Sequence, residues 1–218
     1  MKLLLTSNGL SNNSIIQAFF ELVDKKPEDT KIAFIPTAMN VECGDKSWFI
    51  NDLVNTQKTG AIIDIVDISA LKKDIYLPRL ETADVLFFCG GNSYHLMRWI
   101  QESGLQEELS RLLETRIYVG ISAGAMVTSP DLYLSNKDKS IYYEEMFNIK
   151  INEALGYVEF YIRPHFNSVH FPHANDENIS KIATKTDNTI YGLDDNSAIK
   201  IDGELIEIIS EGNWKKYN

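Results

Sequence analysis

Short, wholly apolar runs alternate with longer amphipathic stretches over the first half of this 218-residue chain. A run such as Val85-Leu86-Phe87-Phe88 has no polar residue on either face of a strand. Such a run is typical of a parallel strand that helices cover on both faces. The stretch 46–59 instead spaces its apolar side chains, among them Phe49 and Leu53, as a helix does. The alternation predicts an α/β fold, a doubly wound, mostly parallel sheet with helices on both faces.

The two patterns also predict where the elements lie. The expected strands of the first part are Lys2–Thr6, Lys31–Pro36, Ala61–Asp67, Asp84–Cys89 and Arg116–Ile121. The expected helices are Ser14–Asp24, Lys46–Thr59, Tyr94–Glu102 and Gln106–Glu114. The last third adds strands at Tyr157–Ile162, Thr189–Leu193, Ala198–Ile201 and Leu205–Ile209, with Asp202-Gly203 as the turn of a C-terminal hairpin. We expect the polar segment 131–151 to be a surface excursion or hairpin, and residues 1–218 to form one domain.

Composition excludes several classes of protein. With 21 Lys and Arg against 31 Asp and Glu, the chain carries a formal net charge of −10, which repels phosphate backbones and argues against a nucleic-acid partner. Its two cysteines, Cys43 and Cys89, form no paired motif for a disulfide framework or thiolate metal site. The apolar start turns polar at Thr6, so we interpret it as a first strand rather than a signal peptide. No apolar stretch approaches the roughly 18 residues that span a bilayer, so we expect a cytoplasmic protein without membrane contact.

One pentapeptide, Gly120-Ile121-Ser122-Ala123-Gly124, lies between a β-prone run and a segment that can begin a helix. Gly-x-Ser-x-Gly in that context is the pattern of a nucleophile elbow, a turn so tight that only small side chains fit around the serine. Ser122 is therefore a candidate nucleophile, and the backbone N–H of Ala123 a candidate donor to an oxyanion. The alternative is a glycine-rich turn with an incidental serine.

A second glycine-rich turn, Phe88-Cys89-Gly90-Gly91-Asn92, stands at another boundary between a strand and a helix. The N–H groups of Gly90 and Gly91 are candidates for further oxyanion donors. Asn92 or Ser93 is a candidate for capping the following helix, and Asn92 is also a candidate for binding substrate. A phosphate cradle is the competing interpretation, but the complete nucleotide-binding motifs are absent from the sequence.

A serine nucleophile needs a base, and the base needs an acid that orients it. His165 follows the expected strand 157–162, and the end of that strand is a position from which it could reach the same rim as Ser122. Asp195 or Asp194, just after the run 189–193, is a candidate for the acid. An ordinary turn rich in Asp and Asn fits these two residues equally well.

The remaining histidines carry weaker hypotheses. His95 falls in an expected helix, where we interpret it as a packing or surface residue. His170 and His173 form with His165 a loose pattern for zinc, which Pro172 interrupts, and we expect no metal.

Chain order separates two folds that share the elbow. The candidates run Ser122, His165, Asp195, whereas an α/β-hydrolase runs serine, acid, histidine. Four motifs occur in the order Cys89-Gly90-Gly91-Asn92, the elbow through Ala125, Pro164-His165-Phe166 and Gly192-Leu193-Asp194-Asp195. Together they resemble the peptidase E (α-aspartyl dipeptidase) and cyanophycinase family of serine peptidases. The fold of that family is similar to the class I glutamine amidotransferases.

The resemblance implies Ser122 as nucleophile, His165 as general base and acid, and an oxyanion hole from Ala123 and the Gly90-Gly91 turn. It implies no metal and no cofactor. The family acid is typically a glutamate, and Asp195 matches it best although its side chain is one methylene shorter. Asp194 is the next candidate and Asp138 a distant third.

The resemblance also bears on substrate. Family members that require an N-terminal aspartate carry an arginine after the histidine, and the segment 172–179 has none. Arg163 is a possible substitute that binds the substrate carboxylate, unless it is a strand residue that faces solvent. We predict a metal-independent serine peptidase of small peptides, acting as a monomer or homodimer. The alternatives are a cyanophycinase-like or other amide or ester hydrolase, a binding module without catalysis, and a partner subunit like those of amidotransferases.

Overall fold

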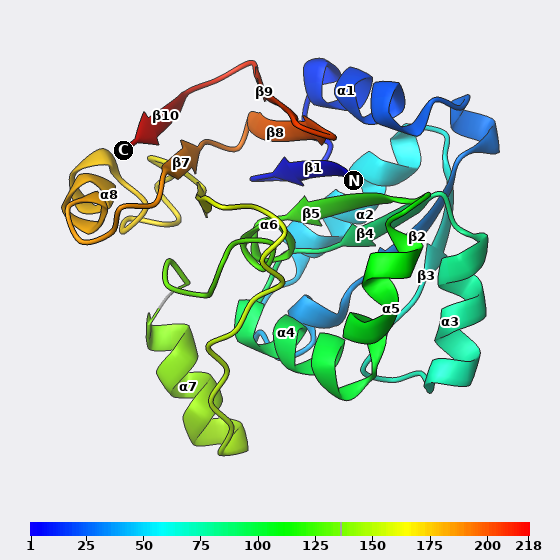
Figure 1. Ribbon diagram of the computed structural model, residues 1–218, viewed down its shortest axis with the longest axis horizontal. Helices are drawn as coiled ribbons and strands as arrows, with labels where there is room; N and C mark the ends of the chain where they lie inside the picture. The colour runs from blue at the N-terminus through cyan, green and yellow to red at the C-terminus, as the bar shows by residue number, and fades with distance from the viewer. Residues whose placement is uncertain (136) are drawn as a thin grey trace.

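A seven-stranded sheet forms the centre of the computed structural model, which describes residues 1–135 and 137–218, with the side chains of residues 137 and 138 outside that description (Figure 1). The strand order is β3-β2-β4-β5-β1-β8-β9. The strands are β1 (Lys2–Thr6), β2 (Lys31–Ile35), β3 (Ile62–Ile65), β4 (Val85–Phe88), β5 (Ile117–Ile121), β8 (Ser197–Asp202) and β9 (Leu205–Ser210). The first five are parallel, and β8 and β9 extend the sheet in antiparallel pairing. The predicted α/β fold with a mostly parallel sheet is confirmed.

Helices cover the sheet on both faces, with α5 in front and α2 behind it in Figure 1. The helices are α1 (Asn13–Val23), α2 (Ser47–Lys58), α3 (Lys73–Thr82), α4 (Ser93–Glu102), α5 (Leu105–Leu112), α6 (Ala123–Met126), α7 (Lys137–Phe147) and α8 (Asp176–Ala183), with short 3₁₀ turns η1 (Pro27–Asp29) and η2 (Thr37–Met39). This covering buries every residue of β4 and β5, which explains why both read as continuous apolar runs. In the part of the chain that the structure describes, no helix is both long enough and apolar enough to cross a membrane.

A second, three-stranded sheet has the order β10-β7-β6. Its strands are β6 (Tyr161–Pro164), β7 (Ile190–Leu193) and β10 (Trp214–Tyr217). β6 runs parallel to β7, and α8 packs against β7. The small sheet lies on the side toward which the arrowheads of β1 and β5 point, so the ends of both sheets meet there (Figure 1).

Several expected elements differ from those observed. Segment 131–151 contains helix α7 rather than a hairpin. The strand expected at 157–162 is observed as Tyr161–Pro164, because the N–H groups of Tyr157 and Val158 donate to the carbonyl of Thr128 instead of to a strand. β8 extends to Asp202, which pairs with Leu205, so the two residues of the hairpin turn are 203 and 204.

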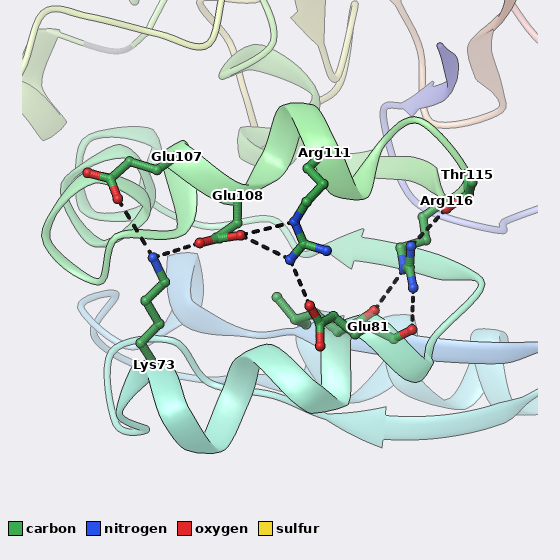
Figure 2. Close-up of polar contacts among 8 residues, drawn as sticks. Lys73, Glu81, Glu107, Glu108, Arg111, Thr115 and Arg116 are labelled. Carbon is green, nitrogen blue, oxygen red and sulfur yellow. Dashed lines mark hydrogen bonds and ion pairs between the residues drawn. The ribbon is translucent and has the colours of Figure 1, made fainter.

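Helix α3 has no counterpart among the predicted elements, because Pro78 lies inside it and proline disfavours a helix interior. Figure 2 shows ion pairs that join α3 to α5: Lys73 contacts Glu108 at 2.9 Å, and Arg111 contacts Glu81 at 2.7 Å. Such exposed pairs stabilise a fold only weakly. The two fully buried side chains of α3, Tyr76 and Leu80, therefore account for most of its attachment.

Candidate active site

The elbow forms where β5 ends and α6 begins. Ser122 has φ 46° and ψ −101°, a conformation that a non-glycine residue adopts only where its surroundings fix it. Its N–H donates to the carbonyl of Thr6 on the adjacent strand at 2.9 Å. A Cβ at Gly124 would lie 2.3 Å from the carbonyl oxygen of Phe88, so the helix can approach the sheet this closely only with glycine at that position. The predicted strand–turn–helix context of Ser122 is therefore observed.

The structure brings Ser122, His165 and Asp195 together. Nε2 of His165 lies 3.0 Å from Oγ of Ser122, and Nδ1 lies 2.6 Å from Oδ1 of Asp195. His165 follows β6 and Asp195 follows β7, two parallel strands that end at the same edge. The imidazole also stacks on the ring of Phe171, with centroids 4.0 Å apart and planes at 9°. The array has the connectivity of a serine nucleophile, a base and an orienting acid.

Asp194 and Asp195 are neighbours in sequence but face different groups. Asp194 accepts hydrogen bonds from the hydroxyl of Ser197 at 2.6 Å and from the N–H of Asn196 at 3.0 Å, so it stabilises the turn before β8. Burial alone would raise the pKa of Asp195, but hydrogen bonds from His165 and Ser7 hold that pKa below its ordinary value. Asp195 is thus the carboxylate that faces the imidazole. The side chain of the third candidate, Asp138, lies outside the described residues.

Two backbone N–H groups without an acceptor in the described chain belong to residues that line the same cavity as Ser122. Ala123 and Gly91 line a cavity of about 60 Å³ beside Ser122, and their N–H groups donate to no other group among the described residues. Gly91 has φ +136°, and a Cβ there would lie 2.2 Å from the carbonyl oxygen of Ala38, so no other residue fits. Gly90 is not part of the lining; it packs behind the elbow, where its Cβ position would be 3.5 Å from the Cβ of Ser122.

Of the two candidates for capping α4, Asn92 is the N-cap, and Ser93 is the first residue of the helix. Its Oδ1 accepts from the N–H groups of Tyr94 and His95, both at 3.0 Å, and the side chain is 1% exposed. Asn92 does not line the cavity, and its Nδ2 has no hydrogen-bond partner among the described residues. Binding of substrate by Asn92 stays a prediction, which the capping role does not require.

Two cationic side chains, Arg163 and Lys139, line the cavity. Nη1 of Arg163, on β6, donates to the carbonyl of Leu134 at 3.0 Å, and no carboxylate of the described residues pairs with its guanidinium. Burial lowers the pKa of Arg163. Lys139, on α7, pairs with Glu42 at 2.8 Å and donates to the carbonyl of Gly91 at 3.1 Å. Arg163 thus faces the cavity rather than solvent, and its charge has no partner in this part of the chain.

The other histidines lie outside the cavity. Burial lowers the pKa of His95 to about 4, and its Nδ1 lies 3.1 Å from the hydroxyl of Tyr143, so His95 packs α4 against α7. His170 and His173 are exposed in the loop after His165. Among the side chains that the structure describes, no cluster of three or more His, Cys, Asp or Glu is placed to hold a metal ion.

Residues 3–209 match the model of Peptidase family S51. The chain belongs to this family. As an S51 member it is a serine-type peptidase, and the resemblance to the peptidase E family found in the sequence is confirmed.

Known proteins are similar to this chain over most of its length. A peptidase E of Streptomyces coelicolor is 28% identical over 214 residues, covering 94% of this chain and 82% of its own. An uncharacterized peptidase of Pasteurella multocida is 26% identical and covers 86% and 88%. A crystal structure of a "Putative Peptidase E Protein" from Listeria monocytogenes superposes with a TM-score of 0.78 at 25% identity, covering 97% of this chain and 98% of that one. That likeness confirms the fold predicted for this S51 chain.

Sequence reasoning missed three side chains around the cavity beside Ser122. Ser7 follows β1 and bonds to Asp195, Phe171 stacks on His165, and Lys139 of α7 lines the cavity. None of them belongs to a motif that marks catalytic residues, and only the pairing of β1 between β5 and β8 brings Ser7 to the site.

Proposed function

We propose that this S51 peptidase cleaves short peptides with an acidic N-terminal residue through an acyl-enzyme on Ser122. The observation that carries the proposal is the array in which one imidazole lies 3.0 Å from the hydroxyl of Ser122 and 2.6 Å from the carboxylate of Asp195. No metal is needed, because the base, the nucleophile and the oxyanion donors are all protein groups.

The reaction follows from these positions. His165 takes the proton of Ser122 as Oγ attacks the peptide carbonyl carbon, and Asp195 holds the imidazolium that results. The N–H groups of Ala123 and Gly91 donate hydrogen bonds to the oxygen on which negative charge develops, and so stabilise it. His165 then gives its proton to the leaving amine, and a water, activated by the same nitrogen, releases the acyl group from Ser122.

The proposed preference for an acidic N-terminal residue rests on Arg163. A half-buried guanidinium next to the nucleophile is costly without an anionic partner, and a substrate carboxylate would supply that partner in the planar geometry that arginine favours. Among the relatives, a Drosophila melanogaster protein named as a probable alpha-aspartyl dipeptidase is 28% identical over 145 residues. This chain lacks the arginine expected after the histidine, so Arg163 takes that role on a different segment.

The test is amine release from a panel of matched dipeptides that begin with Asp, Asn, Glu, Gln or Ala, together with a β-aspartyl peptide and an ester, without added metal. Ser122→Ala is the control variant, with its fold checked by circular dichroism. We expect cleavage of Asp peptides well above Asn peptides, and none by Ser122→Ala. Full activity of folded Ser122→Ala would overturn the mechanism, and equal rates for Asp and Asn peptides would overturn the acidic preference.

A further inference from the structure

The last residue of β1 and the short segment that follows it contact all three residues of the proposed triad. The carbonyl of Thr6 accepts from the N–H of Ser122 at 2.9 Å. The hydroxyl of Ser11 donates to the backbone carbonyl of Asp195 at 2.8 Å. Between them, the hydroxyl of Ser7 touches both His165 and Asp195. β1 lies at the centre of this arrangement because it pairs with β5 on one side and β8 on the other.

Ser7 is fully buried, and the hydrogen bonds of its hydroxyl have only one consistent direction. The backbone N–H of His165 can only donate, so Oγ of Ser7 accepts from it at 2.8 Å. The hydroxyl proton is then free to go to Oδ1 of Asp195 at 3.0 Å, the same oxygen that faces the imidazole. The N–H of Ser7 donates to the carbonyl of Ser197 at 3.2 Å, which ties this residue to the start of β8.

The backbone that Ser7 holds is in an unusual conformation. His165 has φ +60°, in the left-handed region that residues other than glycine seldom adopt. Such a conformation persists only where the surroundings fix it, and the direction of the His165 side chain follows from it. The hydroxyl of Ser7 is the acceptor that satisfies the N–H of His165 in this position.

We propose that Ser7 is a positioning residue, whose hydroxyl fixes the His165 backbone and the Asp195 carboxylate at the separation that the imidazole bridges. The inference rests on the proposed triad. Removing the hydroxyl leaves the N–H of His165 without an acceptor and Oδ1 of Asp195 with His165 as its single donor among the described residues. Reorientation of the imidazole by about 1 Å is enough to cost on the order of 100-fold in rate.

The test compares Ser7→Ala with Ser11→Ala, a matched control in which the lost hydroxyl touches only the backbone of Asp195. For Ser7→Ala we expect kcat to fall about 100-fold with KM little changed, and for Ser11→Ala a change of less than about threefold. The rate at which phenylmethanesulfonyl fluoride modifies Ser122 should fall by a similar factor in Ser7→Ala, because that reaction needs the base but no peptide site. Wild-type kcat and wild-type modification rate in folded Ser7→Ala would overturn the proposal.

Two further controls keep the outcome clear. Where Ser7→Ala does not fold, Ser7→Cys replaces the hydroxyl by a weaker donor and acceptor, and a wild-type kcat in that variant overturns the proposal equally. The low-field proton NMR signal of an imidazole N–H bound to a carboxylate should shift in Ser7→Ala and stay in place in Ser11→Ala; an unmoved signal in Ser7→Ala contradicts the proposal. If Ser122→Ala keeps its activity, the proposed function fails whatever Ser7 does; if only the Ser7 effects are missing, the positioning role alone fails.

Discussion

The two sides of Ser122 differ in how fully their polar groups are paired. On the side of β1, the hydroxyl of Ser7 has both of its partners, and the carboxylate of Asp195 accepts from two donors. On the side of β6, the guanidinium of Arg163 bonds to one carbonyl and to no carboxylate within the described ranges. Gly91 and Ala123 also line the cavity, and their N–H groups have no acceptor in that part of the chain.

The difference separates the two tasks of the site. Groups that must keep one geometry through the reaction are held by hydrogen bonds within the protein, which limits their reorganisation as charge develops. Groups that meet the substrate keep their hydrogen-bonding capacity for it. A substitution on the first side should therefore slow every substrate, and one on the second side should discriminate between substrates.

The largest loss of activity is expected on the side where the polar groups are paired. Asp195→Asn keeps the shape of the acid but offers the imidazole a neutral amide, which favours the wrong tautomer of His165. We expect kcat to fall by about 10³- to 10⁴-fold for acidic and neutral peptides alike. Steady-state kinetics on both peptide classes make the measurement. Asp194→Asn, which alters only the turn, is the matched control; a larger loss in that variant than in Asp195→Asn would contradict the assignment.

A smaller and selective effect is expected on the unpaired side. Arg163→Met keeps much of the side-chain volume and removes the charge, so a charge-assisted hydrogen bond to the substrate is lost. We expect kcat/KM for Asp peptides to fall by about 10- to 150-fold and that for Asn peptides to change less than about threefold. Competition between the two peptides in one reaction measures the ratio directly. An equal loss for both would mean that Arg163 supports the fold rather than recognising a carboxylate.

A carboxyl on α2 contrasts with Asp195. Asp52 is 7% exposed and has no side-chain hydrogen bond in the described chain; burial and the nearby charge of Asp195 raise its pKa to about 7. A raised folded-state pKa lowers stability as pH rises from about 4, where unfolded aspartate ionises, to about 7, and the loss is complete above that. Asp52→Asn should therefore stabilise the protein at pH 8, by at most about 4 kcal/mol.

Thermal unfolding of wild type and Asp52→Asn from pH 4 to pH 8 makes that comparison. The two melting temperatures should converge toward pH 4 and separate as the pH rises. A constant difference across the range would show that Asp52 does not titrate in this way.

The smallest effect is expected far from both sides. Arg111→Ala removes the central cation of the exposed network between α3 and α5 (Figure 2). We expect a loss of less than about 1 kcal/mol, weaker still in high salt, with kcat unchanged. Urea unfolding at low and high salt measures it, and a loss of more than about 2 kcal/mol would show that α3 depends on these pairs rather than on its buried side chains.

The sequence predicted what short-range sterics require, and it missed what depends on distant pairing. The elbow at Ser122 was predictable because only small residues fit around so tight a turn. Ser7 was not, since a serine after an apolar run carries no signal until β1 is known to lie between β5 and β8. Spacing in the sequence could not show whether Asp194 or Asp195 faces the imidazole. The two residues are adjacent, and only the path of the chain after β7 sets the direction of each side chain. Helices α3 and α7 were missed because Pro78 and a polar composition obscure helical periodicity, and helix α8 and strand β10 were not predicted either.

The most direct test of the account is covalent labelling of the nucleophile. The protein is reacted with a fluorophosphonate, digested, and mapped by mass spectrometry, while loss of peptidase activity is followed in the same samples. The account predicts one adduct, on Ser122, that forms in step with the loss of activity and is absent from Ser122→Ala. Complete labelling of Ser122 with peptidase activity retained, or complete inactivation without an adduct on Ser122, would contradict it.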